Sequence, residues 1–343
     1  MKKEIKKYKY DGSKDFDISS FDCSDKGSFS DRTEAEAELA ENLEQISALQ
    51  KKLYAEKKEG VIFIFQALDA AGKDGTIDAV FGCLSTHGVN EYSFKTPSET
   101  ETRHDYLWRF WPALPEKGGI SIFNRSYYED VLCQRVHRYY ENYSFADRID
   151  TDDIIDERYP QIKNFEKYLW ENSIRVVKIF LDVSKEEQAL RFLSRMDTPK
   201  KNWKASKGDV DERAFWNENM KAFQICINKT ATEQAPWSVV PADHKWYARL
   251  IVSRIVLDVL TDMNPHWPKA DKAEQAGFDA LKRELLKEGK VRKLYEKERI
   301  KTVSVKTRVK SDSEKERAKT VSVKERAKDN SEKEQPADNG AQA

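Results

Sequence analysis

The chain has 343 residues, which is enough to bury a substantial core in one large domain or in two. Its 60 basic residues balance its 60 acidic residues, so no overall field draws it to nucleic acid or to a membrane, and a polyanion site must be a local basic patch. The charged N-terminus, the lack of any apolar run near the roughly 18 residues of a spanning helix, and four scattered cysteines without a C-x-x-C pair indicate a cytoplasmic protein.

The predicted elements begin after a polar, turn-rich N-terminal arm over residues 1–30. Apolar residues then recur at helical spacing over Thr33–Lys57, which predicts one long amphipathic helix. Beyond it, strand-like runs alternate with helical stretches. The strands are expected at Val61–Phe65, Tyr92–Lys95, Ile120–Phe123, Ile174–Val183 and Trp237–Pro241. The helices are expected at Thr76–Thr86, Ser98–Trp111, Tyr127–Arg138, Ile155–Glu171, Lys185–Arg195, Asp211–Gln234 and Lys245–Met263.

Continuous apolar strands that alternate with helices are typical of a parallel sheet covered on both faces. We therefore predict an α/β protein, a three-layer α/β/α sandwich. Ligands bind such folds at the carboxyl ends of the strands. The segments Asp69–Lys73 and Asn124–Arg125 both follow predicted strands directly, so they are expected at one site.

The C-terminal part of the chain differs in composition from the rest. Residues 301–318 and 319–336 are tandem copies of one polar 18-residue segment without aromatic residues. Such a segment cannot bury enough apolar surface to order itself, so residues 301–343 are predicted to be a disordered tail. The folded domain is expected to span residues 31–300.

The segment Val61–Thr76, VIFIFQALDAAGKDGT, joins an apolar strand to a helix through Gly72 and Lys73. Backbone N–H groups at a helix start, with a lysine at the bend, bind phosphate oxygens, so this layout indicates a phosphate-binding loop. It departs from the pattern G-x-x-x-x-G-K-[ST], because Ala67 replaces the first glycine and Asp74 replaces the hydroxyl residue. A helix-capping turn with a surface lysine is the alternative.

Without a hydroxyl after the lysine, Mg²⁺ needs another oxygen ligand, and a carboxylate in the loop can supply it. Asp69 comes at the end of the strand, so we predict that it binds the metal. Asp74 is equally well explained by its favourable interaction with the helix dipole. The residues expected to bind phosphate around the loop are Ala70, Ala71, Gly72, Asp74, Gly75 and Thr76.

A second constellation lies in Ile120–Asp130, ISIFNRSYYED, where an apolar strand delivers a polar residue at its end, as in a Walker B element. That residue is Asn124 rather than aspartate. Arg125 follows and could clamp phosphate with two parallel hydrogen bonds, or form a buried ion pair instead. Glu129 could supply the acidity that Asn124 lacks, or simply favour a helix start.

Basic residues collect in a third segment, residues 191–213, around Pro199 and Gly208. Such a loop is typical of a lid that closes over an anionic substrate, with a solvated charged loop as the alternative. Candidate substrate-binding cations in it are Arg191, Arg195, Lys201 and Lys204. Arg109, in an aromatic stretch, either packs in the core or binds the phosphate of an acceptor.

Taken together, four segments resemble polyphosphate kinase family 2. They are A-L-D-A-A-G-K-D-G-T, S-E-T-E-T-R-H-D-Y-L-W-R, F-N-R-S-Y-Y-E-D-V and A-P-W-S-V-V-P-A-D-H-K-W-Y-A-R, within about residues 30–265. The resemblance implies a P-loop, thymidylate-kinase-like fold with a helical lid. It also implies reversible, Mg²⁺-dependent phosphoryl transfer between inorganic polyphosphate and AMP or ADP.

By position, the resemblance implies that Asp69, Lys73 and Arg125 are catalytic and that the basic loop covers a polyphosphate channel. Asn124 and Glu129 make the segment look like the subgroup called class III, which is described as phosphorylating both AMP and ADP. The implied partners are polyphosphate and adenine nucleotides, with guanine nucleotides left open. A homo-oligomer is expected by analogy.

Two other functions remain open at this point. One is a nucleoside monophosphate kinase that uses ATP, although such loops normally retain Ser or Thr where this chain has Asp74. The other is an inactive phosphate-binding module whose repeat tail recruits partners. The presence of Asp69, Lys73 and Arg125 argues against an inactive module.

Overall fold

The computed structural model describes residues 2–204 and 206–299, apart from the side chains of residues 2, 3 and 204. Contacts divide the chain into two compact units, residues 1–268 and residues 269–343. The division falls earlier than the expected domain end near residue 300, because helix α11 (Lys272–Leu285) buries none of its side chains. The predicted disordered tail, residues 301–343, lies outside the described residues.

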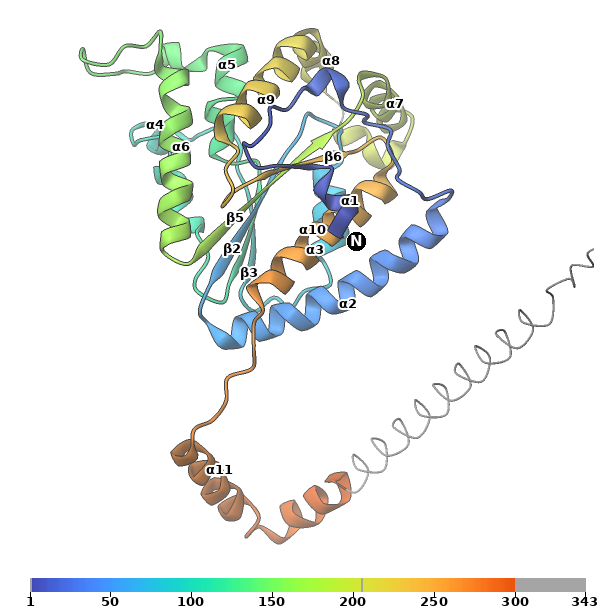
Figure 1. Cartoon of the computed structure of the whole chain (residues 1–343), viewed down its shortest axis with the longest axis vertical. Coiled ribbons are helices and arrows are strands. Elements are labelled where there is room, and N and C mark those ends of the chain that lie inside the picture. Colours follow the sequence, from blue (N-terminus) through green and yellow to red (C-terminus); the bar gives the residue numbers. More distant parts are fainter. Residues whose placement is uncertain (1, 205, 300–343) are drawn as a thin grey trace, which may run out of the picture. The chain divides into compact units, whose positions relative to one another are not determined.

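One sheet organises the first unit, with its strands in the order β1-β6-β5-β2-β4-β3 (Figure 1). The strands are β1 (Lys9–Tyr10), β2 (Gly60–Gln66), β3 (Val89–Ser93), β4 (Ile120–Asn124), β5 (Ile174–Asp182) and β6 (Trp237–Pro241). All neighbours are parallel except β1, which pairs antiparallel with β6. Strand β2 is central, and its Phe65 lies opposite Asn124 on one side and Ile179 on the other.

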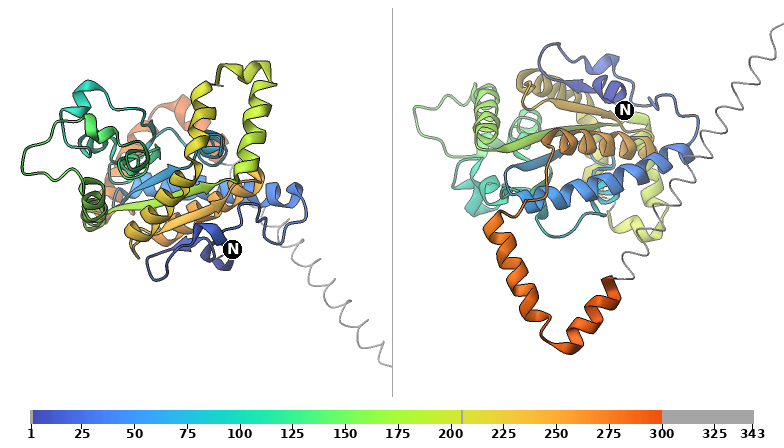
Figure 2. Two further views of the ribbon diagram at one scale, coloured as in Figure 1. Left: turned by 90° about the horizontal axis from the view of Figure 1, so that it is seen from above. Right: turned by 60° about the horizontal axis from the view of Figure 1, so that its bottom comes forward.

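Strand β2 is buried along its whole length, and its side chains enter two separate cores. Phe63 and Phe65 join one core, and Ile62 and Ile64 join the other, because successive strand residues point to opposite faces. Helices α2 (Arg32–Glu56), α3 (Lys73–Phe81) and α10 (Lys245–Met263) supply the first core, and α6 (Ile154–Glu171) and α9 (Trp216–Thr230) supply the second. The views of Figure 2 show helices on both faces of the sheet, so the predicted α/β/α fold is confirmed.

The N-terminal arm is part of the first unit. Helix α1 (Lys2–Lys6) precedes β1, which extends the sheet beyond β6. Tyr8 Oη lies 2.9 Å from Tyr247 Oη in α10, and the Phe16 backbone N–H donates to Asn228 Oδ1 in α9 at 2.7 Å. The arm therefore packs against both β6 and the helices beside it.

The prediction of one helix over Ser98–Trp111 is wrong. The segment forms a short helix α4 (Glu99–Thr102) and a 3₁₀ helix η2 (Trp108–Ala113). Between them the Asp105 carboxylate accepts a hydrogen bond from the Leu107 backbone N–H at 3.0 Å. Aspartate that bonds nearby backbone in this way favours a turn over a helix, and Pro112 further limits the second element.

Other boundaries shift by a few residues. Helix α3 begins at Lys73 rather than Thr76, and β3 lies earlier than the expected Tyr92–Lys95. The expected helix Tyr127–Arg138 is a 3₁₀ turn η3 (Tyr127–Asp130) followed by α5 (Cys133–His137). The remaining elements are η1 (Ile18–Ser20), η4 (Tyr139–Asn142), α7 (Lys185–Met196), η5 (Pro199–Lys204), α8 (Lys207–Glu212) and η6 (Arg213–Phe215).

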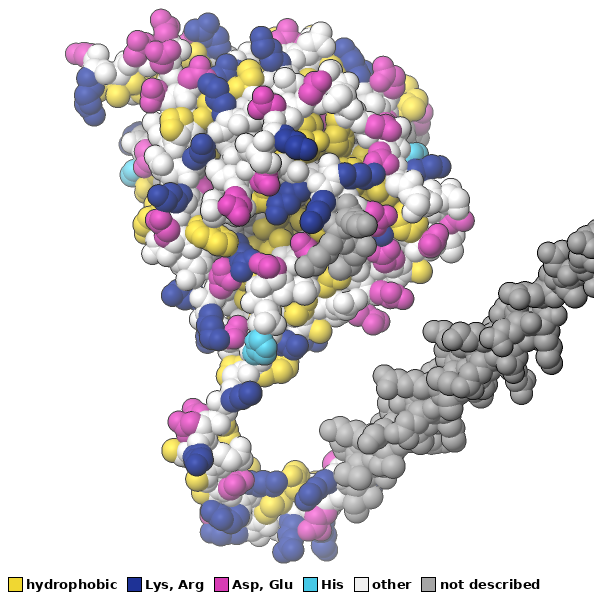
Figure 3. Space-filling view, in the orientation of Figure 1, with side chains coloured by type: hydrophobic (Ala, Val, Ile, Leu, Met, Phe, Trp, Pro, Cys, Tyr) yellow, Lys and Arg dark blue, Asp and Glu magenta, His cyan; other side chains and the backbone are white. Residues whose placement is uncertain are grey.

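Acidic and basic side chains are interspersed across the face in Figure 3. Over residues 2–204 and 206–299, no helix combines the length and the apolar character needed to cross a membrane.

Candidate active site

The carboxyl ends of the strands meet around one cavity of about 1550 Å³. Strand β2 leads into the phosphate loop, β4 into Arg125, and β3 into Lys95, and all three segments line the cavity. The helices that follow β5 and β6, α7 and α10, line it from the other side. The strand order therefore places the phosphate loop in the middle of the site.

The phosphate loop has the backbone conformation that its sequence allows. Gly72, the residue before α3, has φ 106°, a value that residues with a Cβ rarely adopt. Lys73 begins the helix and donates from Nζ to the carbonyl of Ala67 at 2.7 Å. Burial lowers the pKa of Lys73 to about 8, and the neighbouring Arg125 adds to this effect. An arriving phosphate would reverse that shift by favouring the ammonium form.

Asp74, which follows the loop lysine, and Asn124, which ends the Walker B strand, both depart from common P-loop sequences, and the two departures compensate each other. Asn124 at the end of β4 donates from Nδ2 to Asp74 Oδ1 at 2.9 Å. In common P-loop proteins a hydroxyl residue follows the lysine and an aspartate ends the Walker B strand. Here the carboxylate and the uncharged donor have exchanged places, so Asp74 joins the helix start to the neighbouring strand.

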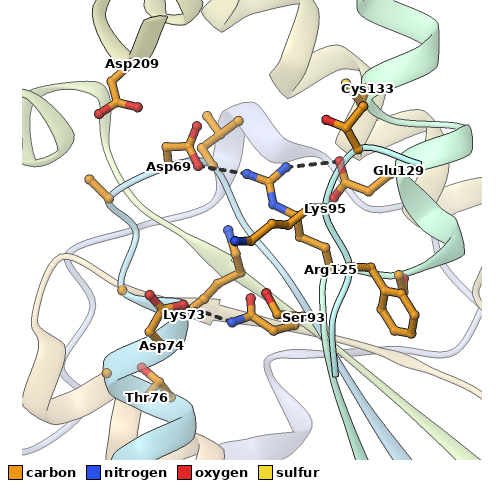
Figure 4. A pocket seen from close by; sticks show the side chains of 18 of the residues that line it. Asp69, Lys73, Asp74, Thr76, Ser93, Lys95, Arg125, Glu129, Cys133 and Asp209 are labelled. Atoms are coloured by element: carbon orange, nitrogen blue, oxygen red, sulfur yellow. Dashed lines mark hydrogen bonds and ion pairs between the residues drawn. The ribbon is translucent and has the colours of Figure 1, made fainter. Parts of the chain in front are cut away.

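Arg125 lies between two carboxylates, as Figure 4 shows. Its Nη2 donates to Asp69 Oδ1 at 2.9 Å, and its Nη1 donates to Glu129 Oε2 at 3.3 Å. The Glu129 carboxylate, with Asp69, raises the pKa of Arg125 above its ordinary value. All three side chains retain roughly a third of their surface exposed toward the cavity. The arrangement keeps the positive charge of Arg125 beside the Asp69 carboxylate, which a ligand in the cavity can contact.

Arg191 anchors the phosphate loop through its whole guanidinium group, which is buried. Nη1 donates to the carbonyls of Ala70 and Ala71 at 3.1 and 2.6 Å. Nη2 donates to the carbonyls of Ala242 and Asp243 at 2.5 and 3.0 Å, and Nε donates to Glu187 Oε1 at 2.7 Å. These bonds use all five N–H groups, so the geometry supports a positioning role, and direct substrate binding by Arg191 stays a prediction.

The other candidate substrate-binding cations of the predicted lid are Arg195, Lys201 and Lys204. Arg195 and Lys201 line the cavity, and Arg195 Nη1 lies 3.3 Å from Asp209 Oδ2. The side chain of Lys204 lies outside what the structure describes. Closure of residues 191–213 over a substrate stays a prediction.

Aromatic residues line the cavity on the β3 and β4 side. Arg109 lies over the rings of Phe94 and Phe110, 5.4 and 5.7 Å from their centroids, and its Nε is 3.1 Å from Glu101 Oε1. Both aromatic residues also line the cavity. Arg109 therefore packs against aromatic rings and still borders the site, which fits both interpretations left open by the sequence.

Three cations that border the cavity escaped the sequence analysis: Lys95, Lys245 and Arg249. Lys95 points into the site in Figure 4. Lys95 and Lys245 follow the carboxyl ends of β3 and β6 by a few residues, and Arg249 lies one turn further along α10. That position was the available signal, because polar residues after parallel strands gather at the ligand-binding edge.

Within the described ranges, no group of three or more His, Cys, Asp or Glu side chains is arranged to hold a metal ion. Asp69 and Asp74 are the carboxylates of the phosphate loop that line the cavity, and Asp74 already accepts a hydrogen bond from Asn124. Mg²⁺ commonly binds one or two carboxylates together with waters and substrate phosphates, so this donor set fits a metal that arrives with a phosphorylated substrate.

A mostly parallel sheet, with a phosphate loop on its central strand and an arginine on the next, defines a P-loop phosphotransferase fold. A sequence profile for the family described as Polyphosphate kinase 2 (PPK2) matches residues 29–268. An "ADP-polyphosphate phosphotransferase" of Rhodopseudomonas palustris is 41% identical over 259 residues, covering 73% of this chain and 87% of the relative.

An "AMP/ADP-polyphosphate phosphotransferase" of Meiothermus ruber is 37% identical over 272 residues, covering 79% of this chain and 98% of the relative. The crystal structure of polyphosphate kinase 2 from Arthrobacter aurescens matches with a TM-score of 0.70 at 38% identity, covering 77% of this chain and 93% of the other. The chain belongs to the polyphosphate kinase 2 family, as its motifs predict.

Proposed function

We propose that this protein transfers the terminal phosphoryl group of inorganic polyphosphate to AMP or ADP. The observation that carries the proposal is the Arg125 guanidinium held between Asp69 and Glu129, beside the Lys73 loop, in a family of polyphosphate kinases. The named activities of the two relatives, on ADP and on AMP and ADP, support the choice of acceptors.

The reaction is balanced within the two substrates. The bond between the terminal phosphorus and its bridging oxygen breaks, and a terminal oxygen of the nucleotide forms the new bond to that phosphorus. The shortened chain leaves with the bridging oxygen, and the reverse step follows the same path. Such transfers need positioning and charge neutralisation rather than covalent catalysis by the protein.

Each residue at the centre has a role that its geometry allows. Lys73 supplies an ammonium group where the loop amides meet the phosphates. Arg125 keeps its charge and can offer its planar fork to the phosphoryl group. Asp69, in the loop after β2, would hold Mg²⁺ that enters with the phosphates. The metal would neutralise phosphate charge when bound.

The acceptor and the donor are expected to occupy opposite arms of the cavity. The β3 and β4 side carries the aromatic residues Phe94 and Phe110, which can pack against a nucleotide base. The β5 and β6 side carries basic residues of α7, η5 and α10. Polyphosphate is a polyanion without a base, so the basic arm suits the donor.

Several finer points belong to the same proposal. The four cysteines are free thiols, which agrees with a reducing, cytoplasmic location. Because Asn124 and Glu129 resemble the subgroup called class III, we also propose that the protein phosphorylates both AMP and ADP. The use of guanine nucleotides and assembly as a homo-oligomer stay predictions.

A donor comparison tests the proposal. Purified full-length protein, Mg²⁺ and AMP are incubated with polyphosphate or with ATP, and nucleotide products are separated by chromatography. We expect ADP and then ATP with polyphosphate as donor. Product with ATP alone would favour a nucleoside monophosphate kinase, and no product with either donor would favour a binding module. Asp69→Asn is expected to abolish transfer, with Asp105→Asn, outside the cavity, as the matched control.

A further inference from the structure

Three consecutive backbone carbonyls of the phosphate loop are held by side chains of one helix, α7. Gln188 Nε2 donates to the carbonyl of Asp69 at 2.9 Å. Arg191, one turn further along the helix, donates to the carbonyls of Ala70 and Ala71. Gln188 is 4% exposed and does not line the cavity. It therefore holds the backbone of a residue predicted to be catalytic without reaching the cavity itself.

The loop backbone is strained at the residue that follows. Ala70 has φ 63°, a left-handed conformation that alanine rarely adopts, and Gly72 has φ 106°. A strained conformation costs free energy and persists only where the surrounding structure holds it. The carbonyl of Asp69 belongs to the peptide group that enters Ala70, so the hydrogen bond from Gln188 restrains the strained turn directly.

The other end of the Gln188 amide is bonded to the last residue of the basic segment 191–213. Arg213, in η6, donates from Nη1 to Gln188 Oε1 at 2.6 Å and to the carbonyl of Lys185 at 2.9 Å. An arginine only donates and a backbone carbonyl only accepts, so these neighbours allow one orientation of the amide. Both ends of the Gln188 amide are therefore used, and together they connect Arg213 to Asp69.

We propose that Gln188 and Arg213 are positioning residues for phosphoryl transfer, which hold Asp69 in place from the end of the segment predicted to form the lid. The kinetic consequences of this inference rest on the proposed function. Without the bond from Gln188, the turn at Ala70 is expected to relax, and the Asp69 carboxylate then leaves its place beside Arg125. Because Asp69 and Arg125 are assigned to the phosphoryl group and not to the base, kcat should fall while KM for AMP stays the same.

Amide hydrogen exchange of the ligand-free, full-length protein tests the positioning without turnover. In Gln188→Met, residues 67–76 should exchange about tenfold faster or more, because a lost hydrogen bond to a buried carbonyl makes local opening easier. Gln50→Met is the matched control, since Gln50 is also buried and donates from Nε2 to the carbonyl of His87 at 2.9 Å, outside the cavity. The control should leave exchange in residues 67–76 within about twofold.

Steady-state kinetics with polyphosphate, Mg²⁺ and AMP separate the two hydrogen bonds of Gln188. Gln188→Glu keeps the acceptor for Arg213 but loses the donor to Asp69. Its kcat should fall about tenfold or more, as in Gln188→Met, with KM for AMP within about twofold. Arg213→Met should lower kcat in the otherwise unaltered protein but not in Gln188→Met, because Arg213 acts through the glutamine.

Three results would overturn the inference. Unchanged exchange in Gln188→Met would show that the loop keeps its conformation without Gln188. A near-normal kcat in Gln188→Glu would remove any need for the bond to Asp69, and losses of kcat that add in Gln188→Met/Arg213→Met would separate Arg213 from Asp69.

A second variant and a second readout keep the test decisive. If Gln188→Met does not fold, exchange is measured in Gln188→Glu, which retains the bond to Arg213. If the loop loosens as expected in the variants but the unaltered protein transfers nothing from polyphosphate, the proposed function is contradicted and the positioning of Asp69 stands.

Discussion

Replacing Arg191 by lysine separates a positioning role from direct substrate binding. The guanidinium joins two loops, because it donates to Ala70 and Ala71 in the phosphate loop and to Ala242 and Asp243 after β6. A lysine keeps the positive charge but carries three N–H groups instead of five, and a single nitrogen cannot span both loops. The variant therefore removes the connection while leaving the charge in place.

The magnitude follows from the lost hydrogen bonds. At least two of the acceptors lose their partner, and each unsatisfied buried group costs about 1–3 kcal/mol, so the free energy of unfolding should fall by about 2–6 kcal/mol. For a folded unit of this size, about 1 kcal/mol changes the melting temperature by about 2–4 °C. The expected fall in Tm is thus about 4 °C or more. A loosened loop should also raise KM for both the nucleotide and polyphosphate.

Thermal unfolding, followed by circular dichroism, and steady-state kinetics together decide the point. Arg32→Lys, in α2, is the matched control, because its ion pair with Glu36 is exposed and outside the cavity and should change the unfolding free energy by less than about 1 kcal/mol. An unchanged Tm for Arg191→Lys, with a higher KM for polyphosphate alone, would refute the positioning role and support direct contact with the donor.

Three further predictions concern the centre of the site and the core. Arg125→Lys should lower kcat about 100-fold or more without changing Tm, because it loses the planar fork; a near-normal kcat would contradict this. For Lys73, kcat/KM should fall as the pH rises through about 8, because the free enzyme then loses the ammonium proton; a flat pH profile would argue against it. Glu166→Leu removes the carboxylate that lies 2.8 Å from the buried Lys178 ammonium and neutralises it. Urea unfolding should therefore show a loss of about 3–5 kcal/mol, partly restored in Glu166→Leu/Lys178→Met.

The central strands were predictable because the apolar pattern that identifies each of them lies within the strand itself. β2 and β5 are long, buried runs, and a strand covered on both faces reads as a continuous apolar segment. β1 could not be predicted, because two residues in a polar arm become a strand only by pairing with β6. The segment Ser98–Trp111 was wrongly predicted as one helix because its composition favours a helix. In the structure the Asp105 side chain stabilises a turn within it.

The sequence could predict those site residues that come shortly after the end of a strand. Asp69 and Arg125 follow adjacent strands, and the structure brings them to 2.9 Å. The hydrogen bond between Asp74 and Asn124 was not evident, because each looked like a separate defect until the fold placed them together. The contacts of Arg191 were hidden as well, since a basic residue in a charged segment gives no indication of which carbonyls it will meet.

The central claim is that one phosphoryl group moves directly from polyphosphate to a nucleotide. Phosphorus-31 NMR of the full-length protein with AMP, Mg²⁺ and polyphosphate measures both sides of that exchange in one sample. The account predicts one new nucleotide phosphoanhydride for each phosphate lost from the chain, with little free inorganic phosphate. Loss of polyphosphate as free phosphate, with AMP unchanged, would contradict it.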